Sequence, residues 1–372
     1  MAALDESKRQ HLSFCLTLHR AVASGSGDSC FSPYSVASAL GLTSRAARGK
    51  AAEELISLLA GSDADIAKQA ELLHGASALK AQPGREAPVL AVSNTLWAWD
   101  ELPLNEGFLD ELASWPGGRV ATAPFITDPE QARRLVNADV AKTTRGLIPE
   151  LLPPGAIRSD VVAALVNALY LRVAWIHPFG TGATEPADFH APGGTRRVPM
   201  MRQSESFGYA AGDGWQVVVL PGEGGTEAVV LLPDGDLARQ EAELDDVMLA
   251  RLLQAPSRRT VQLSLPKIKL DVRSPLTQAL KELGVGTMFT SDADFSPLTP
   301  DPRLTIADVL HQAVLRVDEQ GFEGAAATAA MFRLVSMSAD EPVTVEVNRP
   351  FLLLVRHAET GVVYFFSRIV DP

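Results

Sequence analysis

One stretch decides how the rest of the chain is interpreted: residues 309–335, VLHQAVLRVDEQGFEGAAATAAMFRLV. Its beginning, Val309 to Val317, has the branched apolar residues of a buried strand. The segment from Glu319 to Phe351 is far longer than the ~15 residues usual for a connection without structure of its own. Gly324 to Phe332 carries no charge, which is unusual for a solvated loop, and Gly321 and Gly324 oppose helix nucleation. This composition suits a segment that is exposed at one time and buried at another.

The overall composition is that of a globular protein. The 372 residues are 46% hydrophobic and 21% charged. The formal net charge of −12 argues against nucleic acid, heparin-like polyanions and acidic membranes as partners. The strongest apolar run, Val161 to Leu171, contains Asn167 and is too short to cross a bilayer.

The order of sequence patterns predicts one α+β domain over residues 1–372. The first 80 or so residues repeat apolar side chains at helical spacing, and Ser32-Pro33 indicates a capped helix start. A longer amphipathic helix is expected at Pro129 to Thr144, and a buried strand at Val161 to Trp175. From Thr184 to Val370 the pattern is mainly strands separated by Gly/Pro turns. Neither a repeat nor a linker divides the chain.

No sequence signature of an enzyme or a cofactor site is present. The chain lacks the motifs of nucleophile elbows, zinc proteases, P-loops and dinucleotide sites, and its seven histidines are scattered singly. We therefore expect no catalytic residue, no metal and no small-molecule cofactor. Cys15 and Cys30 are expected to be free thiols. The N-terminus lacks a signal-peptide pattern, which leaves the compartment open between intracellular and secreted.

Several ordered motifs resemble those of the serpins, a family of serine protease inhibitors. The resemblance spans the chain, and the matching segments are 31–40 (FSPYSVASAL), Asn137, Thr144, Gly146, Ile148, 166–171 (VNALYL), Trp175, Phe179, 198–201 (VPMM), 265–267 (LPK), 311–328, 348–351 (NRPF) and 366–372 (FSRIVDP). It implies about nine helices around three β-sheets, a large central mixed sheet, and an exposed reactive-centre loop at about 319–345.

The mechanism implied by the resemblance is that of a suicide substrate. A serine protease attacks the loop, an acyl-enzyme forms, and the cut loop inserts as a new strand into the central sheet before deacylation. Alternation along an inserted strand would divide the loop into two faces. The inward face is Phe322, Gly324, Ala326, Thr328, Ala330, Phe332 and Leu334, and the outward face is Glu323, Ala325, Ala327, Ala329, Met331, Arg333 and Val335.

By the same resemblance, three groups of residues acquire roles. The hinge of the loop is Glu319, Gly321, Phe322, Gly324, Ala325, Ala326, Ala327 and Thr328. The shutter, a polar cluster that governs sheet opening, is Ser32, Ser35, Asn167 and His311. The breach, at the top of the sheet, is Trp175, Lys267 and Glu319, the last two as an ion pair.

Phe322 departs from the family pattern, because inhibitory relatives usually carry threonine or serine there. Overpacking by the ring would slow insertion, and the alternative function is therefore a non-inhibitory serpin that proteases cleave as a plain substrate. Substitution of Phe322 by threonine should then improve inhibition.

The resemblance implies a reactive bond at Val335–Ser336, because this is the family's loop length from the hinge Glu319, with Leu334–Val335 and Met337–Ser338 as alternatives. These residues suit elastase-like or chymotrypsin-like targets, with a trypsin-like target at Arg333 as a minor option. The region 64–80 lacks a basic helix, so heparin activation is not expected, and we expect a monomer.

Overall fold

The structure of the protein is a computed structural model. The residues that it describes are 5–23, 25–61, 66–105, 108, 115–158, 161–302, 304–323 and 341–372. The described residues contain eight α-helices, against the nine or so that were expected. They are α1 (Glu6–Val22), α2 (Pro33–Ala46), α3 (Gly49–Ala60), α4 (Ile66–Gly75), α6 (Pro129–Thr143), α7 (Leu237–Glu243), α8 (Asp246–Gln254) and α9 (Leu276–Glu282). No helix in these ranges is long and apolar enough to cross a membrane.

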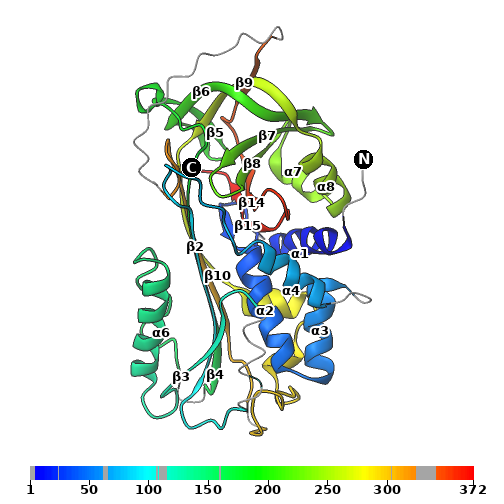
Figure 1. The fold of residues 1–372 in the computed structure, drawn as a ribbon, viewed down its shortest axis with the longest axis vertical. Coiled ribbons are helices and arrows are strands. Elements are labelled where there is room, and N and C mark those ends of the chain that lie inside the picture. Colours follow the sequence, from blue (N-terminus) through cyan, green and yellow to red (C-terminus); the bar gives the residue numbers. More distant parts are fainter. Residues whose placement is uncertain are drawn as a thin grey trace.

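A six-stranded mixed sheet runs down the long axis of the molecule (Figure 1). Its strand order is β10 (Ile268–Pro275), β11 (Val309–Val317), β12 (Gly321–Phe322), β4 (Ala163–Ala174), β2 (Val89–Trp99) and β3 (Gly118–Ala123). The strands expected at Val309 to Val317 and Val161 to Trp175 are therefore confirmed as β11 and β4, neighbours in one sheet.

A nine-stranded sheet lies in the upper half of the molecule as Figure 1 shows it. Its path is β1 (Ser29–Phe31), β15 (Val363–Ile369), β14 (Phe351–His357), β8 (Thr226–Pro233), β7 (Trp215–Gly222), β6 (Gly194–Gly212), β9 (Ser257–Pro266) and β13 (Val343–Glu346), with β5 (Glu185–Ala191) paired to β6. The long strand β6 pairs with β5, β7 and β9 along different parts of its length. Two of the three expected sheets are therefore joined through β6 in the described residues.

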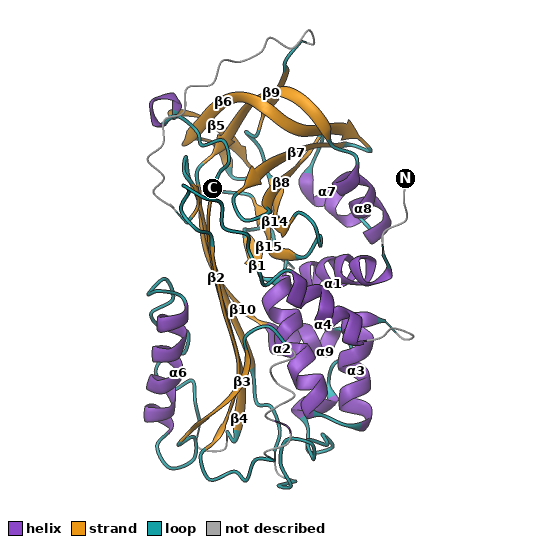
Figure 2. Cartoon of the chain, in the orientation of Figure 1, coloured by secondary structure: helices purple, strands orange, loops and turns teal. Residues whose placement is uncertain are grey.

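The central sheet separates two apolar layers, with α6 on one face and the helices around α2 on the other (Figure 2). Alternate residues of β4 belong to different layers: Leu165 and Leu169 pack in the main core with α2, whereas Val166 and Ala168 pack beneath α6. The expected start of α2 is confirmed, because the Ser32 hydroxyl accepts the N–H of Ser35 and Pro33 opens the helix. The sheet is thus buried on both faces along β4, and a strand that enters it there meets apolar neighbours on each side.

Candidate functional site

The site predicted from the sequence lies along the boundary between β4 and β11, which we call the seam. At its lower end the two strands pair directly and in parallel, with His311 opposite Asn167. At its upper end Gly321 and Phe322 of β12 lie between them, antiparallel to both strands. The described part of the loop that follows β11 therefore already enters the seam.

Gly321 is required where it lies. A Cβ atom at this position would be 2.0 Å from the carbonyl oxygen of Val173 and 2.8 Å from Cα of Ala174, both on the backbone of β4. The φ of Gly321 is +156°, which L-residues rarely adopt. The glycine therefore allows β12 to approach β4 closely enough to pair with it.

Phe322 fills the upper end of the seam from within the main core. Its side chain is 1% exposed, and its ring meets the ring of Trp175 edge to face with centroids 4.6 Å apart. The indole N–H of Trp175 donates to the carbonyl oxygen of Asp318 at 2.9 Å, which holds the turn before β12. The expectation that Phe322 must be forced into the seam after cleavage does not fit this arrangement, because the intact chain already accommodates the ring.

Glu319 fastens the turn to the rest of the upper end. Its carboxylate pairs with the ammonium of Lys267 at 2.7 Å and accepts the hydroxyl of Thr184 at 2.7 Å. Its carbonyl oxygen accepts the N–H of Phe179 at 2.9 Å. Burial raises the pKa of Glu319, but the hydrogen bonds from Lys267 and Thr184 outweigh burial, and the net pKa is lowered. The ion pair expected between Lys267 and Glu319 is present beside Trp175.

At the lower end, the four residues of the predicted shutter form one buried network. The Nε2 atom of His311 accepts the N–H of Ser32 at 3.0 Å, so its Nδ1 carries the proton and donates to Oδ1 of Asn167 at 2.8 Å. The amide of Asn167 donates to the carbonyl oxygen of Ser35 at 2.7 Å. Burial lowers the pKa of His311 from 6.5 to about 4, which keeps the imidazole neutral at pH 7. The network joins α2 to both strands of the seam.

Asn94 is a further member of this network that sequence reasoning missed. It lies opposite Asn167 in the β2–β4 ladder, and its Oδ1 accepts hydrogen bonds from the amide of Asn167 and the hydroxyl of Ser35. Its own amide donates to the carbonyl oxygen of Pro116 at 2.7 Å. A single asparagine within a strand pattern gives no local signal of such a role, and only the register of β2 against β4 reveals it.

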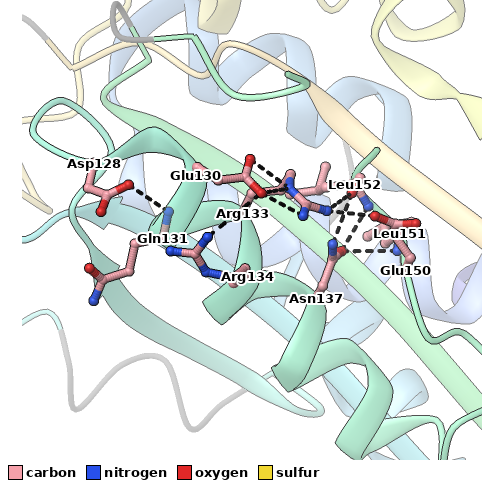
Figure 3. A network of polar contacts seen from close by, with 9 residues as sticks. All are labelled: Asp128, Glu130, Gln131, Arg133, Arg134, Asn137, Glu150, Leu151 and Leu152. Atoms are coloured by element: carbon pink, nitrogen blue, oxygen red, sulfur yellow. Dashed lines mark hydrogen bonds and ion pairs between the residues drawn. The ribbon is translucent and has the colours of Figure 1, made fainter. Parts of the chain in front are cut away.

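The helix α6 covers one face of the seam and is tied to the segment that follows it (Figure 3). The side chain of Asn137 accepts the N–H groups of Leu151 and Leu152 and donates to the carbonyl oxygen of Leu152. Arg133 pairs with Glu130 at 2.7 Å and with Glu150 at 2.6 Å. Because the helix and its following segment are fixed to each other, they cover the sheet as one unit.

Comparison with known proteins identifies the family. The family model described as "Serpin (serine protease inhibitor)" matches residues 9–372. An uncharacterized serpin-like protein of Thermococcus kodakarensis is 30% identical over 97% of this chain and 84% of its own length. The serine proteinase inhibitor A3K of Cavia porcellus is 31% identical over 96% of this chain and 88% of its own length. This chain belongs to the serpin family. The solved structure of the thermophilic serpin tengpin in its native state has the same fold, with a TM-score of 0.87 at 22% identity, over all of this chain and 96% of that one.

Some predicted site residues of this serpin lie outside the described residues. These are the rest of the hinge and the candidate reactive bonds, namely Gly324, Ala325, Ala326, Ala327, Thr328, Leu334, Val335, Ser336, Met337 and Ser338. The described hinge residues and the breach lie at the upper end of the seam, and the shutter lies at its lower end. Their roles in sheet opening stay predictions.

The two cysteines of the serpin are buried and not bonded to each other, as expected. Burial raises the pKa of Cys30 to about 12, so the thiol is un-ionised at neutral pH. Within the described residues, no group of histidine, cysteine or acidic side chains has the arrangement of a metal site.

Proposed function

We propose that this serpin inhibits serine proteases as a suicide substrate. The protease attacks the loop within residues 324–340, its serine is acylated, and the cut loop enters the seam between β4 and β11 before the acyl-enzyme hydrolyses. The chain itself contributes no catalytic group to this reaction. It contributes a strand whose insertion must be faster than hydrolysis of the acyl-enzyme by water.

The observation that carries the proposal is the register of β12. Phe322 pairs with Val317 on β11 and with Val173 on β4, antiparallel to both. Continuation of these two ladders downwards would give residues 323–330 of the loop a partner on each side, as far as the first residue of β11. Insertion would replace the parallel pairing of β4 with β11 by antiparallel ladders, whose hydrogen-bond geometry is slightly more favourable.

The same register assigns a place to Thr328, the one polar residue of the inward face. Six residues beyond Phe322, it would lie opposite His311 on β11 and Asn167 on β4. These two residues hydrogen-bond directly to each other in the intact chain. A threonine hydroxyl both donates and accepts, so it can enter between them without leaving either buried polar group unpaired. An alanine at this position would separate the two groups and satisfy neither.

The outward face of the loop suits the space beneath α6. By the same ladders Ala325, Ala327 and Ala329 would lie opposite Tyr170, Ala168 and Val166 of β4, two of which pack under α6. Small side chains would let the strand enter with little displacement of the helix. This supports insertion along the whole seam rather than at its upper end alone.

Phe322 counts against the alternative of a non-inhibitory serpin. That alternative required the ring to raise the barrier to insertion after cleavage. Because the ring is buried against Trp175 in the intact chain, its insertion precedes cleavage and adds nothing to the later barrier. For the reactive bond we keep Val335–Ser336, with Leu334–Val335 and Met337–Ser338 as alternatives, and for the target an elastase-like or chymotrypsin-like protease.

The decisive experiment incubates the serpin with chymotrypsin and with pancreatic elastase. We expect a covalent adduct that survives boiling in detergent, and mass spectrometry of the released peptide gives the cleaved bond. Thr328→Ala should raise the moles of serpin consumed per mole of protease, whereas Thr344→Ala, at an exposed position of β13, should not. Cleavage without any adduct, together with unchanged heat resistance of the nicked protein, would refute the proposal.

A further inference from the structure

Two cations lie next to each other in the central sheet, on the β11 side of the seam. Lys269 of β10 and Arg316 of β11 lie directly opposite each other, and both are exposed. Neither has an acidic partner within the described part of the chain. Like charges opposite each other on neighbouring strands are unfavourable. An anion placed beside these two cations would relieve the repulsion, and the described residues place none there.

Glu323 is the first residue beyond β12 and the last described residue before the loop. Its N–H donates to the carbonyl oxygen of Arg316 at 2.7 Å, which extends the β11 ladder by one step. Its φ is +66°, in the left-handed region that a residue with a Cβ atom rarely adopts. An extended conformation at Glu323 would remove this strain and continue the strand.

Two charged side chains at this end of the seam each have one buried polar atom without a hydrogen-bond partner. The pKa of Tyr170 is raised by burial and by its hydrogen bond to Glu323, yet the Oε2 atom of Glu323 is buried without a hydrogen-bond partner. On β4, the guanidinium of Arg172 pairs with Glu86 at 2.5 Å, but its Nε atom is also buried without a hydrogen-bond partner. Buried charged groups are stable only when such positions are filled. Arg172 therefore has a free donor, its Nε–H group, and Glu323 has a free acceptor, its Oε2 atom.

The ladders connect these observations. One step beyond Phe322, Glu323 falls opposite Arg316 on β11 and opposite Arg172 on β4. Residues directly opposite in a ladder share a face of the sheet, with Cβ atoms about 5 Å apart. We propose that Glu323 is a positioning residue for strand insertion. Its backbone becomes extended, and its carboxylate moves from Tyr170 to a place between Arg316 and Arg172, which fixes the register of the entering strand. This inference rests on the proposed function, because it needs the loop to insert.

The test uses Glu323→Gln in the full-length chain, with Glu346→Gln as a matched control at an exposed position of β13, which lies outside the central sheet. Insertion after the addition of chymotrypsin is followed by stopped-flow tryptophan fluorescence, and the stoichiometry of inhibition is measured in parallel. At low ionic strength we expect Glu323→Gln to insert about two- to fivefold more slowly than wild type, as for a single ion pair. In about 1 M NaCl the difference should shrink, because Arg316 is exposed and the Debye length falls to about 3 Å.

A double-mutant cycle separates pairing from a merely structural role. Arg316→Gln alone should slow insertion to a similar extent, and the double variant with Glu323→Gln should be no slower than either single variant. Equal rates for Glu323→Gln and wild type at low salt, or a difference that salt does not change, would overturn the inference and leave the proposed function intact. If wild type neither traps the protease nor gains heat resistance on cleavage, both fail.

Discussion

The upper and lower ends of the seam hold the same two strands by different means. At the upper end β12 separates β4 from β11, and the contacts are an aromatic pair and a glycine that allows close approach. At the lower end β4 and β11 pair directly, and a buried hydrogen-bond network of His311, Asn167 and Ser35 closes the seam. Apolar contacts can form one residue at a time, whereas a buried polar network must exchange its partners together. We infer that the upper end sets where insertion starts and the lower end sets how fast it finishes.

The largest effect is expected at the upper end, for Gly321→Ala. The added methyl group would collide with the backbone of β4, which cannot shift without breaking its own ladder. We expect β12 to leave the seam and Phe322 to lose its burial, at a cost of about 3–5 kcal/mol. Thermal unfolding and hydrogen exchange at residues 319–323 measure this. Gly180→Ala is the control, since its Cβ atom would meet nothing within 4 Å. Unchanged protection of the hinge amides in Gly321→Ala would show that β12 does not depend on this close approach.

Asn167→Ala tests the lower end. The substitution leaves the carbonyl oxygen of Ser35 and the Nδ1–H group of His311 without their partner in the core. We expect a loss of about 2–3 kcal/mol in the free energy of unfolding of the intact chain. We also expect faster spontaneous conversion to a heat-resistant form, since the same loss lowers the barrier to opening.

The control for that measurement is Ser38→Ala, which removes a buried hydroxyl bonded within α2, away from the seam. It should lower stability without hastening conversion. If the two variants converted at the same rate, the network would be an ordinary part of the core.

The contrast between the two ends also marks what the sequence could predict. Ser32-Pro33 identified the start of α2, because that signal is local, and the equally local hinge pattern predicts a segment that changes its environment. The occupied upper end depends on Trp175, far from Phe322 along the chain, and on the register of three strands. The same holds for Asn94, whose partner Asn167 is set by the β2–β4 ladder. Residue chemistry is local, whereas register is a property of the assembled sheet.

Acid should weaken the lower end before the upper one. His311 has an ordinary pKa of 6.5 but a pKa of about 4 in the folded protein. Between these values the unfolded chain binds more protons, so the contribution to stability is complete above pH 6.5 and falls as the pH drops towards 4. For His311 alone this amounts to about 2 kcal/mol lost at pH 5.

His11 provides a matched comparison, because burial also lowers its pKa to about 4 but it lies in α1, away from the seam. Replacement of either histidine by glutamine should flatten the dependence of stability on pH. Only His311→Gln should remove the acceleration of spontaneous conversion at pH 5. Equal acceleration in both variants would mean that acid acts on global stability rather than on the seam.

The smallest effect is expected for Lys267→Gln, at the upper end. Lys267 is more than one-third exposed, whereas the side chain of Glu319 is 9% exposed and keeps the hydroxyl of Thr184. We expect a cost of about 0.5–1 kcal/mol that shrinks in high salt, as for other partly exposed pairs. Because the pKa of Glu319 is lowered, its contribution to stability is present above the ordinary pKa of a glutamate and is lost as the pH falls through the folded value. Lys80→Gln, which removes an exposed pair with Glu359, is the control and should cost less. A cost for Lys267→Gln well above 1 kcal/mol would mean that the turn before β12 depends on charge as much as on Phe322, and the proposed difference between the two ends of the seam would narrow accordingly.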